Sequence, residues 1–136
     1  MEKYKKAMVA HSKAGEHNDC SVIATSIACR VPYNAAHSAM KMAGRRSGRS
    51  AKITQMITAM RYLGCELELV SQPKQPNGSS YTMTTIGKLC KRGYWVAYVN
   101  GHVAAVVNGQ VEDWSAGTRR KVQAVWKVTV PRGTRS

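Results

Sequence analysis

A cysteine, a histidine and an aspartate occur in this chain at positions where each could take part in thiol chemistry. Asn18-Asp19-Cys20 precedes an apolar, helix-like run, Gly101-His102-Val103 opens a strand-like run, and Asp113 follows a turn. A thiol is a strong nucleophile only as a thiolate, and a helix N-terminus and a nearby imidazole both favour that ionisation. A third polar group then holds the imidazole in the useful tautomer. Cys20, His102 and Asp113 are therefore candidates for the trio of a thiol hydrolase.

Each of these residues also has a structural interpretation. A lone cysteine in an apolar helix is usually a small core residue, and Asp113 could be a solubilising charge at a strand end. Cys20 and Cys29 differ in their position along the predicted helix. Cys20 lies in the first turn, where the helix dipole favours a thiolate. Cys29 comes nine residues later, on the other face of the helix, and is expected in the core.

His102 differs from the other histidines in its predicted surroundings. His11 and His17 lie in a polar leading segment and His37 on an Ala-rich helix, so all three are expected to be exposed or weakly packed. His102 follows a hairpin turn and starts a strand. A two-residue turn at the next hairpin gives His102 and Asp113 the same pleat parity, as diagonal neighbours within side-chain reach.

The elements that must position these residues change character along the chain. Hydrophobic spacing predicts helices first and strands second, with two Asn-Gly hairpin signals among the strands. The expected helices are 20–30, 33–43, 53–63 and a short one at 84–90, and the expected strands are 66–70, 94–99, 102–107, 110–114 and 122–130. This order predicts one α+β domain over residues 1–136, with N-terminal helices packed on a C-terminal antiparallel sheet. No element is predicted for residues 1–17; 1–16 are expected to be a flexible lead and 131–136 a flexible tail.

The chain is strongly basic. Its 136 residues carry 21 Lys and Arg against 7 Asp and Glu, a net charge of +14. Such a field attracts anions, so an acidic protein or peptide substrate and nonspecific nucleic-acid contact are both expected. The Arg-rich loop at 44–50 could hold phosphates, but it lacks the Gly-Lys pattern of a nucleotide-binding loop.

No targeting or metal signal accompanies these features. The first residues do not open a signal peptide, and no apolar run is long enough to span a membrane, so we expect a cytoplasmic protein without a membrane partner. Neither the four cysteines nor the histidines show zinc-site spacing, so we expect no metal and no cofactor.

The ordered motifs resemble those of the papain-like cysteine peptidase superfamily, most closely the small bacteriocin-processing peptidases. They comprise Asp19-Cys20 at a helix start, Gly101-His102 on a strand and Asp113 after a turn. The run from Asn18 through Pro32-Tyr33 and Gly44-Arg45-Arg46 to Asp113 also resembles a group of small bacteriophage proteins, which would place this chain in host cytoplasm. The resemblance covers about residues 17–128. It implies a papain-like fold, Cys20 as nucleophile, His102 as general base and acid, and Asp113 orienting His102.

The chain departs from the papain-like pattern at one position. Those enzymes usually place a Gln about six residues before the nucleophile, where its amide serves the oxyanion hole, and here the neighbourhood is Lys13-Ala14-Gly15. Asn18 or His17 could substitute, with the backbone N–H of Cys20 as second donor. Asn18 is our candidate for this role.

Three functions remain open from the sequence. The first is a thiol hydrolase acting on a peptide, isopeptide or other amide bond, or an acyltransferase with the same trio. The second is a catalytically idle papain-like domain that binds an acidic partner. The third is a small basic nucleic-acid-binding protein, which the charge favours although no known nucleic-acid module is visible.

Overall fold

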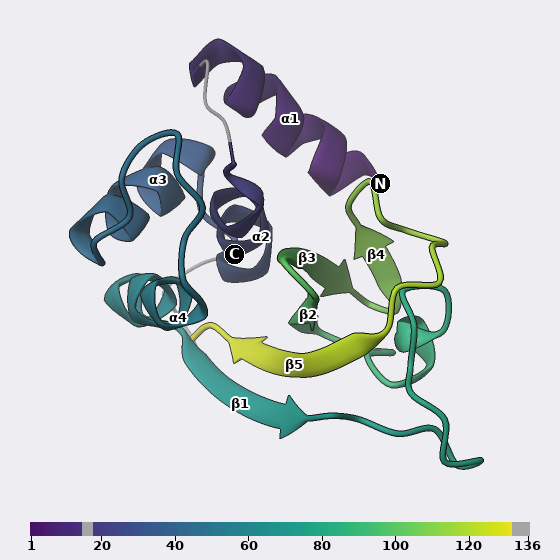
Figure 1. Cartoon of the computed structure of the whole chain (residues 1–136). Helices are drawn as coiled ribbons and strands as arrows, with labels where there is room; N and C mark the ends of the chain where they lie inside the picture. Colours follow the sequence, from purple (N-terminus) through teal and green to yellow (C-terminus); the bar gives the residue numbers. More distant parts are fainter. Residues whose placement is uncertain (15–17, 132–136) are drawn as a thin grey trace.

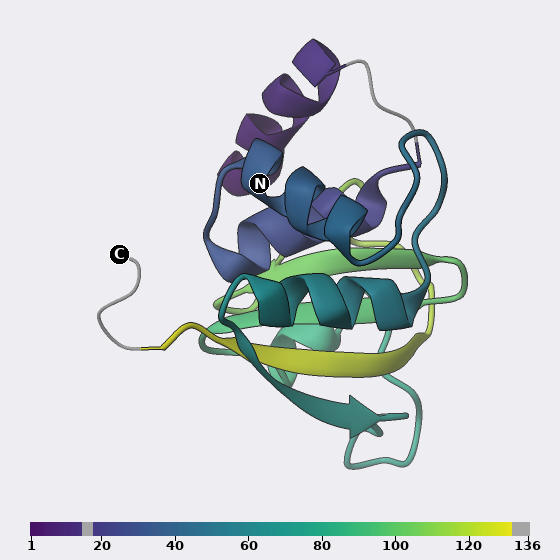
Figure 2. The same ribbon diagram turned by 90° about the vertical axis from the view of Figure 1, so that its left-hand side faces the viewer.

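Four helices cover one face of a five-stranded sheet in the computed structural model, which describes residues 1–14 and 18–131 (Figures 1 and 2). The helices precede the C-terminal sheet, so the predicted α+β arrangement is confirmed. The helices are α1 (Glu2–Ala14), α2 (Cys20–Cys29), α3 (Tyr33–Met42) and α4 (Ile53–Tyr62). The other elements are β1 (Glu66–Ser71), the 3-10 helix η1 (Ile86–Lys88), β2 (Tyr94–Val99), β3 (His102–Val107), β4 (Gln110–Glu112) and β5 (Val122–Thr129).

The sheet is antiparallel throughout and has the order β1-β5-β2-β3-β4. The hairpin between β3 and β4 turns through Asn108 and Gly109, whose φ angles of 49° and 84° suit these two residue types. Val107 pairs with Gln110 and Ala105 with Glu112, which is the register expected from a two-residue turn. Asp113 comes directly after this strand, so the hairpin brings it back toward the start of β3.

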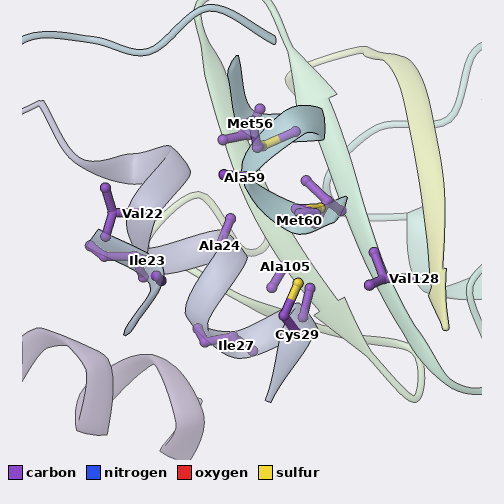
Figure 3. Packing of buried hydrophobic residues seen from close by; sticks show 14 of the residues in the cluster. Val22, Ile23, Ala24, Ile27, Cys29, Met56, Ala59, Met60, Ala105 and Val128 are labelled. Atoms are coloured by element: carbon purple, nitrogen blue, oxygen red, sulfur yellow. The ribbon is translucent and has the colours of Figure 1, made fainter. Parts of the chain in front are cut away.

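The main core lies between the helices and the sheet. Helix α2 is enclosed by α1, α3, α4 and β3. Every residue from Ser21 to Cys29 is therefore buried, and most of these residues are apolar. Figure 3 shows side chains of α2 and α4 packed toward Ala105 of β3 and Val128. The buried position of Cys29 agrees with its expected role in the core. This packing places α2 directly against β3.

The opposite face of the sheet has its own smaller core. The segment between β1 and β2 covers it, with Tyr81, Met83, Ile86 and Cys90 packed against inward-facing residues of β2, β3 and β5. The predicted helix at 84–90 is reduced there to the single 3-10 turn η1. Both faces of β2 and β3 are thus buried, which fixes the position of the β3 residues.

The N-terminal segment differs from the prediction. Residues 2–14 form helix α1 instead of a flexible lead, and Gly15 to His17 lie outside the described residues, as do residues 132–136 of the expected tail. Tyr4, Ala7 and Met8 pack against the main core. Their i, i+3, i+4 spacing is a helical signal that the high content of Lys obscures.

A distant carboxylate stabilises the first turn of α1. The first N–H groups of a helix have no partner within it, and here the Tyr4 N–H donates to Glu112 Oε1 at 3.0 Å. The α-ammonium group of Met1 lies 3.3 Å from the other oxygen of the same carboxylate. Local sequence could not predict this helix start, because its capping group comes from β4.

Candidate active site

Cys20 is the first residue of α2, and its half-buried thiol faces the start of β3. Asp19 occupies the N-cap position, but its carboxylate makes no capping hydrogen bond to the helix. The unpaired N–H groups and the dipole at this helix end favour negative charge. An anion at Cys20, on the sulfur or on a bound carbonyl oxygen, therefore lies in a favourable field.

Asp and Asn are residue types favoured at N-cap positions, so Asp19 or Asn18 would be expected to cap α2, but the Asp19 carboxylate is used elsewhere. Its Oδ2 accepts a hydrogen bond from the Tyr33 hydroxyl at 2.6 Å and lies 2.6 Å from His11 Nδ1. These contacts join α1, the start of α2 and α3 at one buried carboxylate, since Asp19 is only 4% exposed. His11 is thus a specific partner, not the weakly packed histidine expected from its polar segment.

His102 and Asp113 meet at the open edge of the same hairpin. His102 Nε2 lies 2.7 Å from Asp113 Oδ2, and both side chains are buried. The same oxygen accepts hydrogen bonds from the Ser115 backbone N–H at 3.0 Å and from the Ser115 hydroxyl at 2.6 Å. With Nε2 committed to Asp113, His102 has Nδ1 for its hydrogen bond with Cys20. The structure therefore brings the three predicted residues together in the order Cys20, His102, Asp113.

The surroundings of the Cys20 sulfur favour the thiolate. Burial by itself raises the pKa of the thiol, whereas hydrogen bonds from the His102 ring and from the Val103 backbone N–H, and the positive charge of His102, lower it. The lowering effects outweigh burial and the charge of Asp113, so the pKa of Cys20 lies below its ordinary value. Cys90 gives the contrast, because burial without such partners raises the pKa of its thiol to about 12.

The His102 ring shows the complementary change. Burial by itself lowers the pKa of an imidazole, but hydrogen bonds to Asp113 and Cys20 and the charges of both raise the pKa of His102 to about 9. The lowered pKa of the Cys20 thiol and the raised pKa of the His102 imidazole both favour transfer of the proton from sulfur to imidazole. A thiolate beside an imidazolium is the reactive form of a cysteine nucleophile.

Trp114 covers one side of the His102 ring. Its ring lies 4.8 Å from the His102 ring, centroid to centroid, at an angle of 43°. Trp114 is itself 53% exposed, and the Arg120 guanidinium lies 4.9 Å above its ring. Trp114 therefore forms part of the wall around His102, which is 8% exposed.

The Asn18 side chain points toward the loop between α3 and α4. Its Nδ2 donates to the Gly48 carbonyl at 3.0 Å, and its backbone φ of 52° is the left-handed conformation that Asn tolerates. One amide N–H is therefore committed to the loop. The role of Asn18 as an oxyanion donor stays a prediction, and His17, the alternative, lies outside the described residues.

Three residues that contact the site were not predicted from the sequence. Ser115 holds the Asp113 carboxylate, and Tyr33 with His11 holds Asp19, next to the nucleophile. The Asp113-x-Ser115 spacing is a local turn signal that could have been noticed, since Asp side chains accept hydrogen bonds from the backbone two residues on. The Asp19 cluster has no such signal, because its members come from three helices.

The remaining candidates stay apart from this site. His37 lies half-buried beside the Tyr33 ring, with ring centroids 6.0 Å apart, and Cys65 and Cys90 are buried. In residues 1–14 and 18–131, no three His, Cys, Asp or Glu side chains gather closely enough to hold a metal ion. No helix in these ranges has the length and apolar character needed to cross a membrane.

Comparisons with protein-family models, with curated proteins and with solved structures found no match to this chain.

Proposed function

We propose that this protein is a papain-like thiol hydrolase that cleaves a peptide, isopeptide or other amide bond. Cys20 is the nucleophile, His102 the general base and acid, and Asp113 the group that orients and charges His102. The observation that carries the proposal is the chain of contacts from the Cys20 sulfur to His102 and from His102 Nε2 to Asp113 Oδ2 at 2.7 Å. Burial excludes water from these contacts, and this strengthens the electrostatic interactions among the three residues.

The reaction follows from the charges of the pair. The Cys20 thiolate attacks the carbonyl carbon, and the negative oxygen that forms is stabilised by the Cys20 N–H at the start of α2. The His102 imidazolium gives its proton to the leaving amine, the C–N bond breaks, and a thioester remains on Cys20. Neutral His102 then takes a proton from water, whose oxygen attacks the thioester and releases a carboxylic acid and the thiolate. An amine in place of water would make the same trio an acyltransferase.

The two competing functions use less of this arrangement. An idle papain-like binding domain has no need for a buried imidazole between a thiol and a carboxylate. A nucleic-acid-binding protein accounts for the net charge of +14 but for none of the contacts among Cys20, His102 and Asp113. Hydrolysis is the function that uses all three residues together.

Thiol labelling tests the proposal without a known substrate. Native protein is treated with limiting iodoacetamide near pH 6, and labelling is measured at each cysteine by mass spectrometry. Cys20 should react at least about tenfold faster than Cys29, Cys65 and Cys90, because Cys20 is partly accessible and has a lowered pKa, whereas the other three thiols are buried. Cys20→Ser should abolish cleavage of a peptide library while the protein stays folded.

The control separates reactivity from accessibility. His102→Ala leaves the burial of the other thiols in place and removes the activating imidazole, so the native protein should label faster than this variant at pH 6. The two rates should converge at pH 9.5, where an accessible thiol with an ordinary pKa is largely ionised. Equal labelling of Cys20 and the buried thiols at pH 6 would contradict an activated nucleophile. Full biological activity of Cys20→Ser would leave a binding protein built on this fold.

A further inference from the structure

A small basic pocket lies in the loop that joins α3 to α4. Its volume is about 230 Å³, and its described lining is Gly44, Arg45, Arg46, Arg49, Ser50, Lys52 and Gln55. None of these described lining residues is acidic. Residues 20–65 carry seven Lys and Arg and no Asp or Glu, so this stretch of the chain offers the cations no carboxylate of its own.

The loop that forms the pocket has a defined backbone at both ends. Helix α3 closes with Gly44 at a φ of 105°, and the Arg45 N–H returns to the Met40 carbonyl at 2.9 Å, a common helix-ending turn. At the other end the Lys52 N–H donates to Gln55 Oε1 at 2.8 Å, just before α4. The first turn of α4 contains no acidic residue, so its dipole adds to the positive field of the pocket.

The same loop is attached to the segment that carries the nucleophile. Gly48 accepts the hydrogen bond from Asn18 at 3.0 Å, and Arg45 Nη2 lies 3.5 Å from the Asn18 carbonyl. Figures 1 and 2 both place this loop beside the start of α2. Asn18 is two residues from Cys20, and extended chain advances about 3.4 Å per residue. A substrate residue about two to four positions from the scissile bond can therefore reach the loop.

We propose that Arg46, Arg49 and Lys52 form a subsite for an acidic side chain of the peptide substrate, next to the reacting bond. This inference rests on the proposed function, and it adds a substrate class to it. The three side chains are exposed at the pocket and so are available to a ligand. Arg presents a planar fork that matches a carboxylate with two parallel hydrogen bonds. The buried Arg45 and the Asn18–Gly48 bond hold this subsite against the N-terminus of α2.

Matched electrophilic peptides test the subsite. Two sets of tetra-alanine peptides carry one Asp or, as neutral match, one Asn at each position in turn. One set ends in a chloromethyl ketone and the other begins with a chloroacetyl group, so the two sets extend to opposite sides of Cys20. The rate of Cys20 labelling is measured for each probe. We expect at least one Asp probe to react about fivefold faster than its Asn match in low salt, and less so in high salt.

Two double variants test which residues cause the preference for Asp over Asn probes. Arg46→Glu/Arg49→Glu should remove it and should favour a Lys probe at the same position, with each probe rate divided by the rate of the same variant with neutral iodoacetamide so that a change in the Cys20 thiolate itself cancels. The double variant Lys91→Glu/Arg92→Glu changes the net charge equally on an exposed segment after η1 and should keep the Asp preference. Loss of preference in both variants would assign it to the overall charge and overturn the subsite.

The remaining outcomes separate this inference from the function on which it rests. Fast iodoacetamide labelling of Cys20 with equal rates for all Asp and Asn probes would refute the subsite alone. Slow iodoacetamide labelling would refute the hydrolase. A 20-nucleotide DNA that slows all probes, in a manner abolished by Arg46→Glu/Arg49→Glu but with no Asp preference, would assign the pocket to nucleic acid and overturn the peptide subsite.

Discussion

In residues 1–14 and 18–131, two His–Asp pairs have a buried carboxylate, and one of the two histidines faces a thiol. His102 and Asp113 are 2.7 Å apart at the open end of the β3–β4 hairpin, and His11 and Asp19 are 2.6 Å apart between α1 and α2. Both carboxylates are 4% exposed. The difference lies in the third group: the Cys20 sulfur bonds to the His102 ring, whereas in the other pair the Tyr33 hydroxyl bonds to the carboxylate.

The comparison shows that a short His–Asp contact does not by itself define a base. Under the proposed function, the Cys20 thiol beside the His102 ring makes the first pair a route for proton transfer. A hydroxyl on the carboxylate turns the second pair into a link between helices. The expected behaviour of the two pairs is therefore opposite, since the first should control reactivity and the second should control stability.

Removal of each imidazole gives the largest expected difference. His102→Ala should slow iodoacetamide labelling of Cys20 at pH 6 by about 100-fold, because the thiol returns toward a pKa of about 8.5. His11→Ala should change that rate by less than about threefold but should lower the free energy of unfolding by about 1–3 kcal/mol, because a buried carboxylate loses a partner. Labelling kinetics and urea denaturation measure the two effects.

The opposite pattern of effects would contradict the different roles assigned to the two pairs. If folded His11→Ala labelled as slowly as His102→Ala, the Asp19 cluster would belong to the reactive site. His37→Ala removes a third, half-buried imidazole and serves as the control for both measurements.

Removal of the carboxylate charge should have the next largest effect. Asp113→Asn keeps the side-chain shape but replaces a charged acceptor by a neutral one, and the charge and hydrogen bond of Asp113 help to raise the pKa of His102 to about 9. The pKa of His102, followed by NMR of its ring protons, should fall, and Cys20 labelling at pH 6 should slow by about tenfold. Asp19→Asn is the matched change in the other pair, and it should leave the His102 titration in place. An unchanged His102 pKa in Asp113→Asn would remove Asp113 from the trio.

The pH dependence should distinguish nucleophile from acid. Between pH 7 and pH 9, Cys20 labelling should rise less than that of an ordinary thiol, which rises about 25-fold, because the pKa of Cys20 is lowered. Peptide cleavage should fall above about pH 9, where His102 loses the proton that the leaving amine needs. Labelling, which needs no such proton, should not fall there. Parallel decline of both rates above pH 9 would indicate unfolding instead.

The smallest effect is expected from Ser115. Ser115→Ala removes the 2.6 Å hydroxyl contact to Asp113 Oδ2 but keeps the backbone N–H contact at 3.0 Å. The remaining donor still holds the carboxylate, so labelling should slow by about two- to threefold, and stability should fall by about 1 kcal/mol. Thr118→Ala, three residues further on, is the control for a general effect on this loop. A loss as large as that of Asp113→Asn would make Ser115 essential to the trio.

The sequence by itself determined the features that depend on neighbouring residues. Apolar spacing and the Asn108-Gly109 turn were sufficient to predict three helices, the hairpin register and the placement of Cys20 at a helix start. A two-residue turn dictates which residues pair across a hairpin, so the approach of Asp113 to His102 followed from local rules.

Only the tertiary structure decided the features whose partners are distant in the chain. Helix α1 begins at a carboxylate 108 residues away, and Asp19 turns from its expected cap toward groups on two other helices. The contact of Cys20 with His102 likewise depends on how α2 packs on β3, because helix and strand are joined by no local constraint. Packing of the main core sets that distance, and so the ionisation of Cys20 is a property of the whole fold.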